Sequence, residues 1–152
     1  MTSIVASRPD RLRRAWGSVV GRLEALPWAL LALPMRLAAF AVFWRAGMAK
    51  LDSWPTTVLL FREEYKVPVL PPELAAYLAT SIELAGALLL LLGLFTRLSA
   101  LALLGLTTVI QVFVYPESWP AHVQWLAFLL PLLARGAGTI SLDHLLAQRF
   151  RS

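Results

Sequence analysis

The chain has 152 residues, of which 59% are hydrophobic and only 15% charged. A single domain of this length cannot bury that much apolar surface in water, because small domains leave much of their surface exposed, so we expect a membrane protein. The absence of cysteine excludes a disulfide framework, thiolate ligands and a cysteine nucleophile, and with two histidines no metal site is expected.

The net charge of +5 does not indicate nucleic-acid binding. Binding to nucleic acid needs a basic face on a folded soluble module, whereas the basic residues here gather in residues 8–22 and near the C-terminal end, outside the apolar runs. Membrane topology explains that distribution better, and no nucleic-acid partner is expected.

Residues 1–27 are predicted to form a tail that contains an amphipathic helix over residues 11–26. Its apolar positions recur at helical spacing and its basic positions fall largely opposite, the former being Leu12, Ala15, Trp16, Val19, Val20, Leu23 and Leu26, the latter Arg11, Arg13, Arg14 and Arg22. Such a helix lies along a membrane surface rich in anionic lipids.

The next part of the chain, residues 28–135, predicts an all-α membrane domain, a four-transmembrane-helix antiparallel bundle. The apolar segments are about residues 28–51, 73–95, 98–115 and 119–134. At about 1.5 Å per residue they span roughly 25–36 Å, enough for a hydrocarbon core of about 30 Å. Pro34 either kinks the first helix or marks its true start. The last two connections are short and require antiparallel neighbours.

Two further segments flank these helices. In the outer loop, residues 52–72, an apolar face of Trp54, Val58, Phe61 and Tyr65 predicts a short amphipathic helix that covers the mouth of the bundle. After the last span, Gly136 and Gly138 predict a helix stop, and Ser141 opens a short helix in the C-terminal tail, residues 136–152.

The orientation follows from the lysine and arginine residues outside the spans. The side that holds both termini carries nine of them, and the other side carries only Lys50, Arg62 and Lys66. The positive-inside rule therefore places both termini in the cytoplasm, with the protein in the cytoplasmic (inner) membrane of a bacterium.

Ionisable and polar residues inside membrane helices are costly, and they are the first candidates for function. We expect Arg36 to extend to the headgroups from the inner end of its helix. The others fall in the outer half of the bundle: Arg45, Lys50, Glu83, Gln111, His122 and Gln124.

Small residues let helices approach closely in a membrane, and both central charges lie on stripes of small residues. Glu83 shares a stripe with Ala75, Ala79, Gly86 and Ala87, and Arg45 shares one with Ala38, Ala41 and Ala49. The two stripes predict that Arg45 and Glu83 point inward and form an ion pair.

Two interpretations of this cluster remain open. In the first, Arg45 and Glu83 clamp two helices together, and Gln111 and His122 only hydrogen-bond to neighbouring helices. In the second, the cluster lines an outward-facing pocket beneath a lid of Trp54, Phe61 and Tyr65. That pocket binds a quinone headgroup or another small polar ligand, and His122 relays protons. No catalytic residue is assigned.

Three stretches carry a resemblance to a known family. They are Arg45-Ala46-Gly47-Met48-Ala49-Lys50-Leu51, then Ile82-Glu83-Leu84-Ala85-Gly86 with Leu92-Gly93-Leu94-Phe95-Thr96-Arg97, and finally Gly136-Ala137-Gly138-Thr139-Ile140-Ser141-Leu142-Asp143. The chain resembles the DoxX family of four-helix bacterial inner-membrane proteins over roughly residues 33–146.

The resemblance implies a four-helix bundle and, in some relatives, the membrane subunit of a thiosulfate:quinone oxidoreductase. Arg45, Lys50, Glu83 and Asp143 match recurring family positions. The leading hypothesis is a membrane subunit of a quinone-linked redox system. The alternative is a non-catalytic scaffold that anchors a partner protein through the N-terminal helix or the tail. A small-solute transporter is less favoured, because the sequence shows no inverted repeat.

Overall fold

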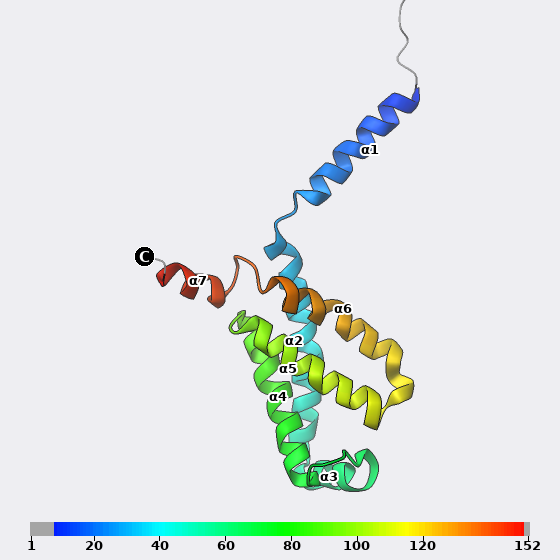
Figure 1. The fold of residues 1–152 in the computed structure, drawn as a ribbon, viewed down its shortest axis with the longest axis vertical. Coiled ribbons are helices and arrows are strands. Elements are labelled where there is room, and N and C mark those ends of the chain that lie inside the picture. The colour runs from blue at the N-terminus through cyan, green and yellow to red at the C-terminus, as the bar shows by residue number, and fades with distance from the viewer. Residues whose placement is uncertain (1–7, 151–152) are drawn as a thin grey trace, which may run out of the picture.

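The computed structural model of the protein describes residues 8–150, and these residues form helices and connecting turns, without a strand among them (Figure 1). Residues 1–7 of the predicted N-terminal tail and residues 151–152 of the C-terminal tail lie outside the described residues. The elements are α1 (Arg8–Glu24), α2 (Trp28–Asp52), α3 (Trp54–Leu60), η1 (Phe61–Tyr65), α4 (Pro72–Leu92), α5 (Thr96–Val109), η2 (Ile110–Val114), η3 (Pro116–Ser118), α6 (Trp119–Arg135) and α7 (Leu142–Arg149).

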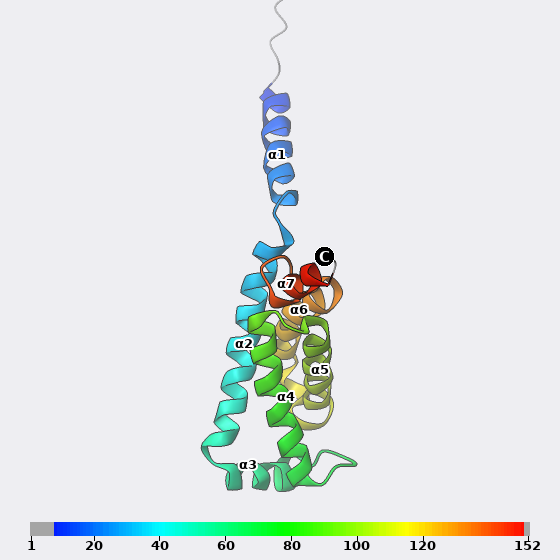
Figure 2. The ribbon, with the colours of Figure 1, turned by 90° about the vertical axis from the view of Figure 1, so that its left-hand side faces the viewer.

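The long helices pack around a common core. α2 lies along α4, α5 packs on both α4 and α6, and α6 returns to contact α2. α1, α7 and the C-terminus lie toward one end of the molecule, here called the α7 end, and α3 lies at the other, the α3 end (Figures 1 and 2). The fully buried side chains at the centre of this packing include Phe43, Leu90, Leu103, Leu129 and Leu132.

Three helices are long and apolar enough to cross a membrane among the described residues. They are Trp28–Asp52, Pro72–Leu92 and the continuous Thr96–Val114, which joins α5 to η2. α6 has 17 residues and reaches about 25 Å at the α-helical rise. Of the four spans expected from the sequence, three thus meet the length and apolarity that a membrane crossing needs.

Proline and glycine set several helix boundaries. Pro72 is the first residue of α4, and Gly93, with φ of 65°, ends that helix in the left-handed conformation that glycine adopts readily. The expected second span ran to residue 95, and this glycine stops the helix earlier. α2 begins at Trp28, so Pro34 lies inside the helix and does not open it.

Two π-helical segments interrupt the regular pattern at the α3 end. η1 follows α3 without a break and ends at Lys66, a left-handed residue, and η2 continues α5 as far as Val114. π-helical turns are rare and occur often at functional sites. The surroundings of η1 and η2 are therefore a candidate functional region.

The α7 end is fastened by Arg36, which corrects our expectation that this side chain reaches the lipid headgroups. The residue is 4% exposed, and its guanidinium donates to the carbonyls of Leu90 and Leu91 at 2.8 and 2.6 Å and to that of Ile140 at 2.5 Å. The carbonyls in the last turn of a helix lack the donors of a following turn, and the arginine supplies N–H groups to two of them. Arg36 thus ties α2, α4 and the chain before α7 together.

Asp143 and Gly138 complete the same connection. The Asp143 carboxylate accepts hydrogen bonds from the backbone amides of Phe95 and Thr96 at 2.7 and 3.0 Å and so caps the start of α5. Gly138 has φ of 78°, and a Cβ atom there would lie 2.8 Å from the Cα atom of Ala29. The segment before α7 can therefore lie directly against α2 only with glycine at this position.

α1 stands apart from the packed helices in both views (Figures 1 and 2). It runs from Arg8 to Glu24, so it starts and ends before the expected limits of residues 11 and 26. Four of its large apolar side chains are exposed, namely Leu12, Trp16, Val19 and Leu23. Its contact with a membrane surface stays a prediction.

Candidate functional site

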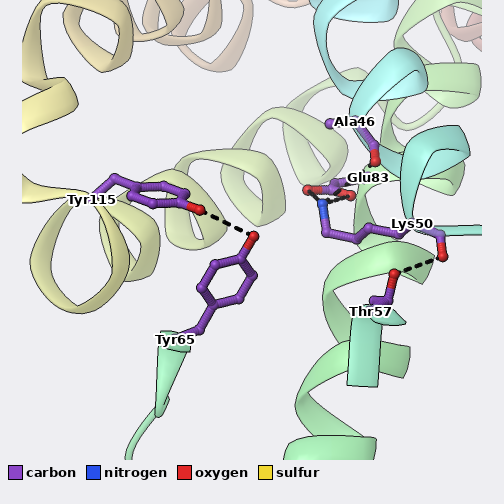
Figure 3. A network of polar contacts seen from close by, with 6 residues as sticks. All are labelled: Ala46, Lys50, Thr57, Tyr65, Glu83 and Tyr115. Atoms are coloured by element: carbon purple, nitrogen blue, oxygen red, sulfur yellow. Dashed lines mark hydrogen bonds and ion pairs between the residues drawn. The ribbon is translucent and has the colours of Figure 1, made fainter. Parts of the chain in front are cut away.

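A buried ion pair joins α2 to α4 near the α3 end. The Lys50 ammonium lies 2.8 Å from both carboxylate oxygens of Glu83, whose side chain is 3% exposed, against 20% for Lys50 (Figure 3). The Thr57 hydroxyl of α3 donates to the Lys50 carbonyl at 2.8 Å and so fixes the end of α2 beside the ion pair. The pair places a full positive and a full negative charge inside the apolar part of the molecule, where each depends on the other.

The prediction that Arg45 forms the ion pair with Glu83 is wrong, because Lys50 takes that place. Arg45 is exposed, and the buried stripe of α2 is Ala29, Ala32, Arg36, Ala39, Phe43 and Gly47. At 100° per residue, Arg45 lies about 200° from both Phe43 and Gly47, on the opposite face, whereas Lys50 follows Gly47 by three residues and shares its face. On α4 the expected stripe is confirmed, since Ala75, Ala79, Glu83, Gly86 and Ala87 are all buried.

Gly47 allows the two helices to approach next to this pair. A Cβ atom at Gly47 would lie 2.6 Å from Leu84 Cδ2 and 3.4 Å from the Cβ of Glu83. A larger residue would force the Leu84 side chain or the helix to shift directly beside the ion pair. The small residue that matters for this ion pair is therefore Gly47, and not the alanines on the Arg45 face.

A cavity of about 80 Å³ adjoins the ion pair. Its walls are mostly apolar and come from η1, α4, α5 and η2, and they comprise Phe61, Tyr65, Val67, Ala79, Leu106, Val109, Ile110, Val114 and Tyr115 with Lys50 and Glu83. Both π-helical segments thus contribute to one cavity. Of the three residues expected to form a lid, Phe61 and Tyr65 line it, while Trp54 packs on Tyr77 with ring centroids 4.4 Å apart and lines a different hollow.

Two tyrosine hydroxyls face the ion pair across this space (Figure 3). The Tyr115 hydroxyl lies 3.2 Å from that of Tyr65 and 3.1 Å from a carboxylate oxygen of the exposed Glu64. Hydrogen bonding to Tyr65, with burial and the neighbouring Glu64 charge adding to it, raises the pKa of Tyr115 above its ordinary value. A chain of oxygen atoms therefore leads from the surface to the wall of the cavity.

Gln111 and His122 form a second, separate polar pair. His122 is 4% exposed, and its Nδ1 lies 2.6 Å from Gln111 Oε1, while Gln111 Nε2 donates to the Pro116 carbonyl at 2.8 Å. That second bond assigns the amide orientation, so Nδ1 carries the proton and donates to Gln111. These side chains line a cavity of about 230 Å³ that shares no residue with the one beside Lys50.

The cluster expected from the sequence is thus divided. Lys50 and Glu83 meet at one cavity and Gln111 and His122 at another, while Gln124 is exposed and lines neither. Sequence reasoning missed Tyr115, because a tyrosine at the end of a span is typical of a membrane interface. What distinguishes Tyr115 is its contact with Tyr65, a residue 50 positions earlier in the chain, and the sequence carries no signal of that contact.

The sequence profile of the DoxX family matches residues 31–116, which include α2 from its fourth residue onward, the ion pair and both π-helical segments. The chain belongs to the DoxX family. No curated protein and no solved structure matches the chain. The expected resemblance is therefore confirmed, and membership together with the apolar spans identifies a membrane protein.

The DoxX match ends before α6 and α7, so the Arg36 and Asp143 connection to residues 138–143 reaches beyond the matched region. Inside that region lie Lys50, Glu83, Tyr65 and Tyr115, the four polar residues around the smaller cavity.

Proposed function

We propose that this DoxX protein is a membrane subunit of a quinone-linked redox system, and that the cavity beside Lys50 and Glu83 takes the quinone headgroup. The observation that carries the proposal is a buried ion pair that opens onto an aromatic cavity with two tyrosine hydroxyls on its wall. A clamp between helices needs no cavity, and helices in a membrane associate without buried ions.

The proposal includes the membrane arrangement. α6 is the fourth span, made shorter by its start at Trp119, and both termini lie in the cytoplasm of a bacterium with the α3 end outside. The excess of lysine and arginine at the α7 end supports this orientation. The ion pair then lies in the outer half of the inner membrane, where lipid-soluble quinones are available.

The residues fit a quinone headgroup in polarity. The Tyr65 hydroxyl would donate a hydrogen bond to a quinone carbonyl, and the Lys50 ammonium would place positive charge beside it. Phe61, Leu106 and Ile110 would supply apolar contact for the ring. A quinone takes up two electrons and two protons on reduction to a quinol, and in this proposal the electrons come from a partner protein. The Glu64, Tyr115 and Tyr65 oxygens hold a path for protons from the surface.

The cavity wall formed by η1 and the segment that follows it must move for a ring to enter. About 80 Å³ holds two or three water molecules at about 30 Å³ each, less than a substituted ring needs. The part that yields is the segment after η1, where Lys66 and the fully exposed Val69 have φ of 43° and 77°. A branched residue in the left-handed region is strained, and such strain is common at switch segments.

The test is the quinone content of protein purified gently from its native membranes. We expect quinone in the wild type and in Glu24→Gln, a control that removes an exposed carboxylate from α1, outside the cavity lining. Removing the buried charge in Glu83→Gln, or the hydroxyl in Tyr65→Phe, should lower the content about tenfold through lost polar contacts. Unchanged quinone in both variants, each shown to be folded by circular dichroism, would overturn the proposal.

The alternative is a non-catalytic scaffold, and α1 is the observation that favours it. This helix stands away from the packed helices and exposes Trp16 and Leu23 at 71% and 61%. As an anchor for a partner protein or for anionic lipids, it predicts that exchanging the surface of residues 11–26 abolishes partner capture. In that case Glu83→Gln leaves the captured partner unchanged.

A further inference from the structure

An open groove of about 810 Å³ lies at the α7 end, where α2 and α5 begin and α6 ends. It shares no lining residue with either cavity described above. Part of its lining is apolar, with Trp28, Phe95 and Leu98, and part is cationic, with Arg97 and Arg135. Phe95 and Leu98 are 60% and 66% exposed, so an apolar surface lies directly beside two charges.

The two arginines are exposed, and each is positioned by a contact with the protein. The Arg135 guanidinium carbon lies 4.4 Å from the ring centroid of Trp28, and Trp28 in turn donates through Nε1 to the Gly136 carbonyl at 2.9 Å. Arg97 donates to the Ala134 carbonyl at 3.2 Å, which uses one of its five N–H donors. Both cations are therefore positioned by the fold while donors remain for a ligand.

The other titratable groups of the groove do not oppose an anion strongly. Asp143 is the acidic residue in the lining, and both of its oxygens accept backbone amides at the start of α5. His144 also lines the groove, and its backbone amide donates to Ser141. Two arginines facing one already bonded carboxylate leave the groove electrostatically suited to a negative charge.

We propose that this groove binds an anionic phospholipid. Arg97 and Arg135 pair with the headgroup phosphate, and Phe95 and Leu98 contact the first part of the acyl chains. Basic pockets between membrane helices at the interface are suited to anionic headgroups. The groove lies at the ends of α2 and α5, both membrane spans, where a lipid places its phosphate and chains in that order. The exposed apolar residues favour a lipid over a free anion.

Native mass spectrometry of the delipidated full-length protein tests the proposal, with phosphatidylglycerol and phosphatidylethanolamine of identical acyl chains. We expect phosphatidylglycerol to bind at least about tenfold more tightly, and the double variant Arg97→Gln/Arg135→Gln to lose that preference, because charge-assisted bonds are lost. The matched control Arg45→Gln removes an exposed arginine from α2 outside the groove and should leave the preference intact.

Further experiments distinguish a bound lipid from a bound soluble phosphate and control for misfolding of the variants. Arg97→Lys/Arg135→Lys keeps both charges and should retain most of the preference, and sn-glycerol 3-phosphate at equal concentration should not displace the lipid. The proposal fails if the glutamine double variant, folded by circular dichroism, still prefers phosphatidylglycerol, since the anionic lipid then binds α1 or elsewhere. It also fails if the soluble phosphate displaces the lipid completely.

Discussion

The Lys50–Glu83 ion pair joins α2 to α4 at 2.8 Å, and the Glu83 side chain is almost fully buried. We expect Lys50→Met to destabilise the protein by roughly 3 kcal/mol, because it leaves the Glu83 carboxylate buried without its counter-ion. The double variant Lys50→Met/Glu83→Leu removes both charges and should recover most of that loss. Chemical unfolding in micelles measures the cycle, and strictly additive effects of the two single substitutions would contradict the coupling.

Tyr115 predicts a measurable effect at high pH. Its folded-state pKa is raised above the unfolded value of about 10, so its contribution to stability is complete below pH 10 and is lost as the pH rises beyond that. Absorbance at 295 nm follows tyrosinate formation, and the chain has only three tyrosines. We expect Tyr115→Phe to remove the step at highest pH. If that step persists in the variant, the hydrogen bonds of Tyr115 to Tyr65 and Glu64 do not hold its proton.

At single positions the sequence predicted which kinds of residue matter better than it predicted their partners. Glu83 stood on a stripe of small residues and is buried, as inferred. Arg45 also lies on a stripe of small residues, yet it is exposed. The helix α2 carries small residues on two faces, and the face that is buried is the one with Phe43 and Gly47. Hydropathy cannot separate two such faces in a membrane helix, since lipid and protein interior are both apolar.

Among the elements, the cap of α5 by Asp143 carries a direct prediction. Asp143→Ala leaves the amides of Phe95 and Thr96 without their acceptor and should cost about 1–2 kcal/mol. It should also loosen the chain before α7, so that trypsin cuts after Arg135 faster than in the wild type. Gln148→Ala, an exposed change on the same short helix, is the control. Equal cleavage rates in the two variants would show that the cap does not hold this segment.

The long helices were predictable because apolar runs bounded by proline and glycine leave few alternatives. The π-helical segments were not, since residues 61–65 and 110–114 have no composition that distinguishes a π turn from an α turn. The pairing of Tyr65 with Tyr115 was hidden for the same reason, as it depends on how η1 and η2 meet. Elements could thus be located from the sequence, and the cavity that they enclose could not.

For the whole molecule, the proposed topology has a simple test because the natural chain contains no cysteine. Single cysteines at the exposed positions Ser53 and Glu117 should react with a membrane-impermeant maleimide in intact cells, while Ser18→Cys and Gln148→Cys should react only after lysis. This pattern requires an even number of spans and includes α6. Labelling of Gln148→Cys in intact cells would place the C-terminus outside and exclude α6 as a span.

The position of Ile140 has a consequence for the order of events during biosynthesis. Arg36 enters the membrane early, in the first long helix, yet one of the carbonyls that its guanidinium binds belongs to a residue translated more than a hundred positions later. The backbone amides of Phe95 and Thr96 likewise gain their acceptor only when Asp143 has been synthesised. Because synthesis runs from the N-terminus, a segment made after α6 completes contacts among helices inserted long before it. A nascent chain halted at Arg135 therefore lacks the Ile140 carbonyl, and its Arg36 guanidinium stays incompletely bonded until the segment before α7 has been made.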